Sequence, residues 1–213
     1  MIQWLRNIRA PKKRYTVWQG IRRILLCLLL GAALGALAKQ LDLASCSGAT
    51  FWERALEWLD LRNFLSDFPF WLAVGLAIAV YAPSAFQAGD GVFFFFLGMC
   101  GAYHWYSIQF GGFNPSGYMR IWYGLTAVSP VLGWLCWYAK GKGPIASGIQ
   151  TLIFTVLLLS CFGIGFWYFD FWGILYTAEF LICVFMLNVT PKRTLACLGS
   201  AVLLAFLLRG TIL

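Results

Sequence analysis

Residues 24–38 of the chain read ILLCLLLGAALGALA, a run without a charged side chain. With its flanks it covers about 22–40, close to the roughly 20 residues that a helix needs to cross the hydrocarbon of a bilayer. Similar stretches recur to the end of the chain, and hydrophobic residues make up 61% of the sequence against 11% charged. Soluble domains carry about a quarter charged residues. The sequence therefore predicts an all-α, polytopic helical membrane bundle.

The apolar stretches predict six or seven transmembrane helices. We expect them at about 22–40, 69–86, 92–110, 119–139, 145–168, 172–188 and 195–208. The last stretch is short, so it either crosses with help from the snorkelling side chain of Arg209 or is re-entrant. We expect a tight turn at residues 87–91, and Pro130 should free a backbone carbonyl one turn earlier and kink the fourth span.

Charge placement predicts the orientation. Residues 1–21 form a basic arm, with a short interfacial helix expected near residues 4–8, and residues 22–213 form a single transmembrane domain. If every stretch crosses once, the arm falls on the same side as the later basic loops, which hold Lys140, Lys142, Lys192 and Arg193. By the positive-inside rule this is a multi-pass protein of the cell membrane with a cytoplasmic N-terminus.

Residues 41–68 are too polar to span and carry more acids than bases, which fits an extracytoplasmic loop. Thr50 and Glu53 have the spacing of a capping box, so a helix should begin here. Over about 51–65, apolar residues recur every three or four positions, and charged residues occupy the positions between them. We therefore expect one amphipathic helix lying on the outer membrane surface.

The first span carries two pairs of small residues four positions apart, Gly31 with Gly35 and Ala32 with Ala36. Small residues at this spacing allow another helix to approach closely. Two interpretations are open at this point. The stripe packs against a helix of the same chain, or it docks a membrane protein partner.

Polar side chains inside a membrane are costly and are therefore candidates for function. With the orientation above, most of them fall in the outer half of the bundle, which predicts an outward-facing polar cavity. Its candidate ligand-binding residues are Glu179, His104, Arg120, Asp170, Trp105 and Tyr106. Glu179 is the leading candidate, either as a binder of cargo or protons or as the structural partner of Arg120. Trp105 is the tryptophan that we expect in a pocket.

Several classes of function are disfavoured by missing motifs. The seven cysteines form no CxxC pair, His104 is the only histidine, and neither GxSxG nor HExxH occurs. We therefore expect no enzyme, metal site or cofactor. The basic arm adjoins a membrane span, so its partner should be the lipid bilayer and not nucleic acid. The resulting hypothesis is a component that binds or transports a small-molecule cargo, and the alternative is a non-transporting accessory or scaffold protein.

Several stretches support a family resemblance. They are FLGMC at 96–100, YHWY at 103–106, FGGFNP at 110–115, SP at 129–130, WYAKGKG at 137–143 and FWYFD at 166–170. In their order and spacing they resemble an uncharacterised family of small multi-pass membrane proteins of Gram-positive bacteria. The resemblance implies a bacterial cytoplasmic membrane and supplies no activity. His104 stands where this family is expected to have an aromatic such as tyrosine.

A looser analogy concerns the substrate-binding subunits of energy-coupling-factor importers. The chain is similar to them in size and in its expected number of spans. Those subunits use small residues on the first helix to dock a partner, and Ala32 and Ala36 match that arrangement. The analogy implies a partner subunit for this chain.

Overall fold

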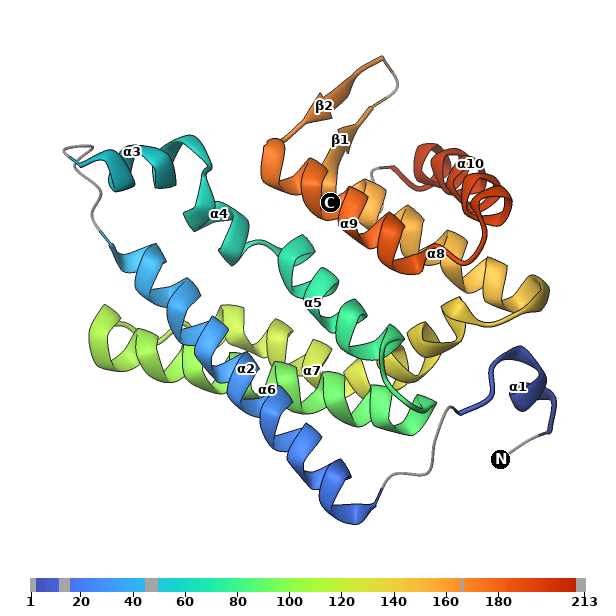
Figure 1. Ribbon diagram of the computed structural model, residues 1–213. Helices are drawn as coiled ribbons and strands as arrows, with labels where there is room; N and C mark the ends of the chain where they lie inside the picture. Colours follow the sequence, from blue (N-terminus) through green and yellow to red (C-terminus); the bar gives the residue numbers. More distant parts are fainter. Residues whose placement is uncertain (1–2, 12–15, 45–49, 166, 210–213) are drawn as a thin grey trace.

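The computed structural model describes residues 3–11, 16–44, 50–165 and 167–209. This part of the chain folds almost entirely into α-helices, which confirms the predicted all-α class (Figure 1). The elements in chain order are α1 Gln3–Ile8, α2 Val17–Leu43, α3 Phe51–Trp58, α4 Leu61–Ser66, α5 Phe68–Val80, α6 Ala85–Gly111, α7 Ser116–Trp137, the 3-10 helix η1 Tyr138–Lys140, α8 Gly143–Cys161, β1 Phe162–Ile164, β2 Phe169–Phe171, α9 Ile174–Leu187 and α10 Pro191–Leu208.

Within the described residues, four helices, α2, α6, α8 and α10, are long and apolar enough to cross a membrane. Two further apolar helices are shorter, with 13 residues in α5 and 14 in α9. By length and composition this set agrees with an integral membrane protein. A count of six or seven spans stays a prediction, because six requires two of the helices α5, α7 and α9 to cross as well, and seven requires all three.

Helix α6 corrects the predicted turn at residues 87–91. The helix already begins at Ala85, and the hydroxyl of Ser84 accepts a hydrogen bond from the amide of Gln87 at 3.3 Å. Serine in this position caps a helix N-terminus by satisfying an otherwise unpaired amide. The cap outweighs the two glycines at 89 and 91, so residues 87–91, including Asp90, lie inside the helix.

The fifth predicted span is also shorter than expected. Helix α8 ends at Cys161, and β1 pairs with β2 as an antiparallel hairpin in which Phe162 lies opposite Phe171. The ring of Phe162 stacks on that of Phe169, with 5.2 Å between centroids. Cross-strand aromatic pairs stabilise hairpins. The hydrophobic composition of residues 162–168 predicted helix, whereas Phe162–Ile164 form a strand that is paired through the ring of Phe162.

The amphipathic segment near 51–65 forms two helices instead of one. The amide of Glu53 donates to the hydroxyl of Thr50 at 3.3 Å, so the predicted N-cap is present. The chain then turns at Asp60, whose φ of 49° is left-handed, and continues as α4. Aspartate tolerates this conformation better than most residues. The location of these helices outside the membrane stays a prediction.

The most extensive helix contact joins α2 to α6, and glycine makes it possible. A β-carbon at Gly31 would lie 1.9 Å from the carbonyl oxygen of Phe95, and one at Gly35 would lie 2.5 Å from that of Met99. On the facing helix, a β-carbon at Gly98 would lie 2.2 Å from the carbonyl oxygen of Leu28. The two backbones therefore touch directly, as expected for small residues at helical spacing.

Basic side chains gather where several helices end. Arg9 donates to the carbonyl of Val80 at 3.0 Å and to that of Trp137, the last residues of α5 and α7. Arg23 donates to the carbonyl of Ile78 at 3.0 Å. Cations are favourable there because the carbonyls at a helix C-terminus are unpaired and carry partial negative charge.

The same end of the molecule receives the C-terminus of α9. Lys140 donates to the carbonyl of Met186 at 2.8 Å, and Arg193 donates to those of Ala139 and Gly141 at 2.7 and 2.6 Å. We call this region, with Arg9, Arg23, Lys140 and Arg193, the basic end. The loops that were expected on one side of the membrane thus meet in space. That this side is cytoplasmic stays a prediction.

The N-terminal arm belongs to the basic end as well. In α1 the side chains of Leu5 and Ile8 are buried, and the carbonyl of Ile8 accepts a hydrogen bond from the amide of Lys142 at 2.7 Å. The expected short helix is therefore present. Its apolar face packs on protein, whereas an interfacial helix would turn that face to lipid.

Candidate functional site

The polar residues that were expected to share a cavity lie in two separate parts of the fold. His104, Trp105, Tyr106 and Arg120 belong to α6 and α7, whereas Glu179 belongs to α9 and Asp170 to β2. Helix α5 lies between α9 and the α6–α7 pair (Figure 1). Among the described residues, these six side chains do not converge on one space.

His104 has both ring nitrogens occupied. Nδ1 lies 2.9 Å from the hydroxyl of Tyr123, and Nε2 lies 2.9 Å from the side-chain oxygen of Asn114. The ring thereby ties α6 to α7 and to the loop between them. This is the geometry of a structural histidine, and it leaves neither nitrogen available for a ligand.

The aromatic residues next to His104 do not form a binding pocket. Trp105 is 57% exposed and makes an edge contact with Phe110, with 5.8 Å between ring centroids. Tyr106 packs against the same phenylalanine at 4.6 Å. The expectation that Trp105 lies in a pocket is therefore wrong, because its ring faces outward from α6.

Glu179 does not pair with Arg120. It is only 6% exposed on α9, and neither carboxyl oxygen has a hydrogen-bond partner in the described part of the chain. Arg120 is exposed near the start of α7, and Asp170 is exposed in the hairpin. Burying a charged carboxylate without a partner is costly, so Glu179 requires either a proton or a cation.

The small-residue stripe of the first span is largely covered by the chain itself. Gly31 and Gly35 are buried against α6, and the amide nitrogen of Ala32 would lie 3.0 Å from a β-carbon on Gly98. Ala36 is half-buried. The structure thus uses the glycines for packing within the chain and does not leave them open for a partner.

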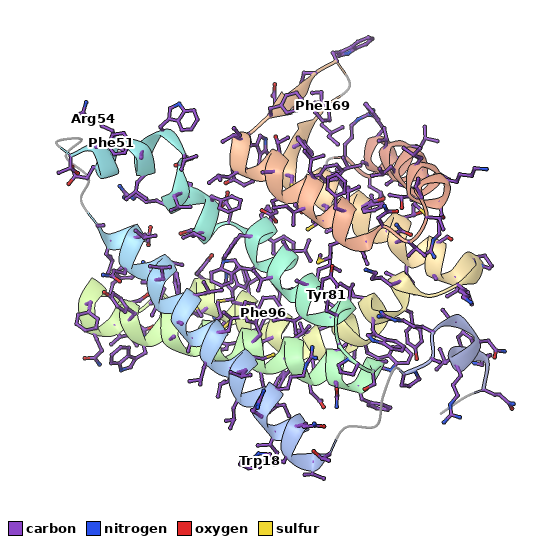
Figure 2. The ribbon with its side chains drawn as sticks, in the orientation of Figure 1. Trp18, Phe51, Arg54, Tyr81, Phe96 and Phe169 are labelled. Atoms are coloured by element: carbon purple, nitrogen blue, oxygen red, sulfur yellow. The ribbon has the colours of Figure 1, made fainter. Side chains whose placement is uncertain are left out.

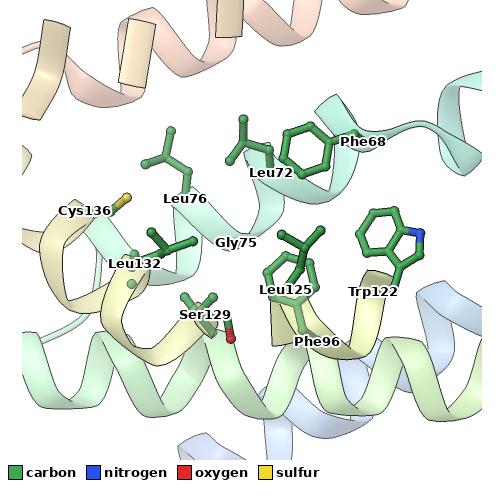
Figure 3. Close-up of a pocket in the computed structure, with 13 residues that line it drawn as sticks. Phe68, Leu72, Gly75, Leu76, Phe96, Trp122, Leu125, Ser129, Leu132 and Cys136 are labelled. Carbon is green, nitrogen blue, oxygen red and sulfur yellow. The ribbon is translucent and has the colours of Figure 1, made fainter. Parts of the chain in front are cut away.

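Unlike the six predicted residues, the residues of one apolar groove do share a single space. The groove lies between α5 and α7, with α6 as its floor (Figure 3). The groove is open on one side, and the space within it and across its opening measures about 550 Å³. We call it the α5–α7 groove. It is lined by Phe68, Leu72, Gly75, Leu76, Ala79, Val92, Phe96, Trp122, Leu125, Ser129, Leu132, Gly133 and Cys136.

Glycine and proline shape the groove. At Gly75 a β-carbon would come within 3.2 Å of the Phe96 ring, so the missing side chain leaves room for that ring between α5 and α6 (Figure 2). Pro130 lies inside α7 and has no amide hydrogen to donate to the carbonyl of Thr126. The hydroxyl of Ser129 donates to that carbonyl instead, at 2.8 Å.

This bond occupies the one proton that the Ser129 hydroxyl can donate, so in the groove this oxygen can only accept. Ser129 contributes the only hydroxyl among the lining residues, and that group is already donating to the backbone. The remaining lining is aliphatic, aromatic or thiol. The groove therefore suits an apolar chain and has no charged group to bind a polar cargo.

The groove is about as long as one leaflet of a bilayer is thick. At 1.5 Å per residue, the lining positions from Phe68 to Ala79 extend over about 16 Å of α5. Those from Trp122 to Cys136 extend over about 21 Å of α7. Half of the hydrocarbon core of a bilayer measures about 15 Å.

No family model, curated protein or solved structure matches the chain. The resemblance to small membrane proteins of Gram-positive bacteria and the analogy to importer subunits therefore stay predictions.

Sequence reasoning missed this groove because its residues come from three separate stretches. The available signals were Pro130 and the two glycines at 75 and 133, which mark places where helices bend or approach closely. Asp90 was also missed, since residues 87–91 read as a turn. None of these signals indicates which helices are neighbours.

Proposed function

We propose that this integral membrane protein is a non-transporting accessory component that holds the acyl chain of a lipid, or of a lipid-linked molecule, in the α5–α7 groove. One observation carries the proposal. The groove is lined by apolar side chains, and its one hydroxyl, on Ser129, is already hydrogen-bonded to the backbone. A polar cargo would find few hydrogen-bond partners and no charge there, whereas an alkyl chain needs none.

Two further features support the same ligand. The groove is open along one side, so a chain can enter laterally from the surrounding lipid without passing through water. Its length corresponds to one leaflet, which fits a single chain lying beside α5 and α7. The ends of these two helices at the basic end are held together by Arg9, so the walls are fixed relative to each other.

The proposal is tested by filling the groove. Leu132 lines the groove and is partly exposed, so tryptophan at this position occupies the space of the ligand. Val128 is an exposed position on the same helix that does not line the groove, and Val128→Trp is the matched control. Native mass spectrometry of the gently extracted protein measures the lipid that remains bound.

We expect the wild-type protein and Val128→Trp to retain a lipid that Leu132→Trp loses, with helix content unchanged by circular dichroism. Equal retention in both variants would show that the lipid binds elsewhere. A wild-type protein that carries no lipid would refute the proposal and favour a pure scaffold. Co-purification of an ATPase-bearing partner would favour the transport hypothesis.

Glu179 is the observation that favours transport as a second candidate function. A buried carboxyl without a hydrogen-bond partner is a common feature of proton- or cation-coupled carriers. Glu179→Gln keeps the shape and removes the acid. On this second hypothesis uptake or cargo binding falls while thermal stability is kept, and unchanged uptake with unchanged stability removes Glu179 from any site.

A further inference from the structure

A second groove lies on the other side of the contact between α6 and α7. It is open on one side, and the space within it and across its opening measures about 580 Å³. Its lining includes Phe86, Asp90, Val131 and Trp134. The two helices touch beside it, where a β-carbon on Gly89 would lie 2.6 Å from the carbonyl oxygen of Pro130. We call it the Asp90 groove. It shares no lining residue with the α5–α7 groove.

Asp90 is an acid on a helix that is apolar enough to span a membrane. Its side chain is exposed, and no described residue forms an ion pair or hydrogen bond with it. On such a helix an acid is costly at the bilayer centre and far less so near the headgroups, where it can pair with a lipid cation. Two aromatic rings, those of Phe86 and Trp134, line the same groove. A carboxylate beside aromatic faces is the combination that binds an ammonium group.

The depth of Asp90 indicates where that ammonium group lies. The 27 residues of α6 extend over about 40 Å, which matches the about 40–45 Å of a bilayer with its headgroups. The helix ends therefore reach both membrane surfaces. Asp90 lies five residues from the first residue, Ala85, or about 7.5 Å along the axis. The headgroup layer on each side is about 5–8 Å thick, so Asp90 lies at its inner boundary.

We propose that the Asp90 groove binds the ammonium headgroup of a membrane lipid. The carboxylate of Asp90 pairs with the ammonium group, which lies against the face of the Trp134 ring. The lipid chains continue along the apolar surface of α7. The occupant follows from charge complementarity and depth, because the ammonium group of a lipid lies in the headgroup layer. This inference does not rest on the proposed function of the α5–α7 groove.

The test uses the full chain in vesicles of phosphatidylglycerol that contain a minor fraction of phosphatidylethanolamine, or in a second arm phosphatidylcholine. Native mass spectrometry of protein released from these vesicles counts the ammonium lipids that stay bound. Asp90→Asn removes the charge at nearly constant shape, and Asp90→Glu restores it. Asp170→Asn is the matched control, since Asp170 is an exposed acid in the hairpin.

We expect Asp90→Asn to reduce retention of the ammonium lipid about tenfold, equivalent to about 1.4 kcal/mol. Asp90→Glu and Asp170→Asn should retain it like the wild type. A preference for the ethanolamine lipid assigns the site to a primary ammonium, and equal retention of the choline lipid assigns it to charge and ring contact. Retention in Asp90→Asn equal to the wild type would overturn the inference. The Leu132→Trp variant should still bind this lipid, so the two proposals fail separately.

Discussion

Replacing Gly98 by alanine should push α2 away from α6. A β-carbon at this position would lie 2.2 Å from the carbonyl oxygen of Leu28 and 3.0 Å from the amide nitrogen of Ala32. Close carbon–oxygen contacts in proteins measure about 3.3 Å or more. The helices must therefore separate locally by about 1 Å, and both opposing atoms are backbone atoms that cannot rotate away.

The expected loss of stability follows from two opposing contributions. Overpacking costs about 1–3 kcal/mol, and the rigid backbone places this case at the upper end. Alanine recovers about 1 kcal/mol of helix propensity relative to glycine. The net destabilisation of Gly98→Ala is about 2 kcal/mol.

Gly101 provides a control on the same helix, three residues further on. Nothing lies within 4 Å of a β-carbon at Gly101, so Gly101→Ala gains helix propensity without a clash and should stabilise by up to about 1 kcal/mol. The two variants thus differ by about 3 kcal/mol. For a chain of this size that corresponds to about 6–12 °C in Tm.

The assay is thermal unfolding of both variants in the same detergent or lipid, followed by tryptophan fluorescence. We expect Gly98→Ala to unfold below the wild type and Gly101→Ala at or above it. If Gly98→Ala is as stable as Gly101→Ala, α2 and α6 do not meet through these glycines, and the reasoning about the stripe fails.

Two further variants, Arg9→Ala and Ser129→Ala, test which side chains bond the unpaired backbone carbonyls at the helix ends and next to Pro130. Arg9→Ala leaves the terminal carbonyls of α5 and α7 without their donor and should destabilise by about 2 kcal/mol, whereas Arg6→Ala, at an exposed position, should change the Tm little. Ser129→Ala leaves the carbonyl of Thr126 unpaired and should cost about 1–2 kcal/mol. In a Pro130→Ala background the amide of residue 130 can donate to that carbonyl, so a double-mutant cycle should show the Ser129→Ala penalty shrink. An unchanged penalty would show that the hydroxyl does not replace the lost backbone bond.

Composition and periodicity were sufficient for the helical class and for most helix positions. The run at 24–38 lies inside α2, and Pro130 lies inside α7 where a kink was expected. Predictions from local sequence were wrong where two local preferences, such as a glycine turn and a helix cap, favoured different structures. Residues 87–91 contain two glycines and read as a turn, yet the cap at Ser84 extends the helix through them. The hydrophobic composition of residues 162–168 favoured a continued helix, yet the ring of Phe162 pairs with those of Phe169 and Phe171 across a hairpin.

The candidate site was less accessible to sequence reasoning than the helices were. Glu179 could be singled out as a buried acid because its position within an apolar stretch is a local property. The expected pairing with Arg120 and the shared cavity with His104 were wrong, since both depend on which helices are neighbours. Trp105 was assigned to a pocket from its proximity to His104, yet adjacent residues on a helix point in different directions.

The sequence by itself determined that this chain is helical, suited to a membrane and basic in its N-terminal arm, because hydrophobicity, charge and capping act over one or two helical turns. Only the tertiary structure decided that Gly31 and Gly35 are used against α6, that α5 separates Glu179 from His104, and that apolar and acidic grooves flank the α6–α7 contact. The reason is physical. Which helix faces which depends on the packing of surfaces far apart in the chain, and apolar residues of similar character can pack in many arrangements.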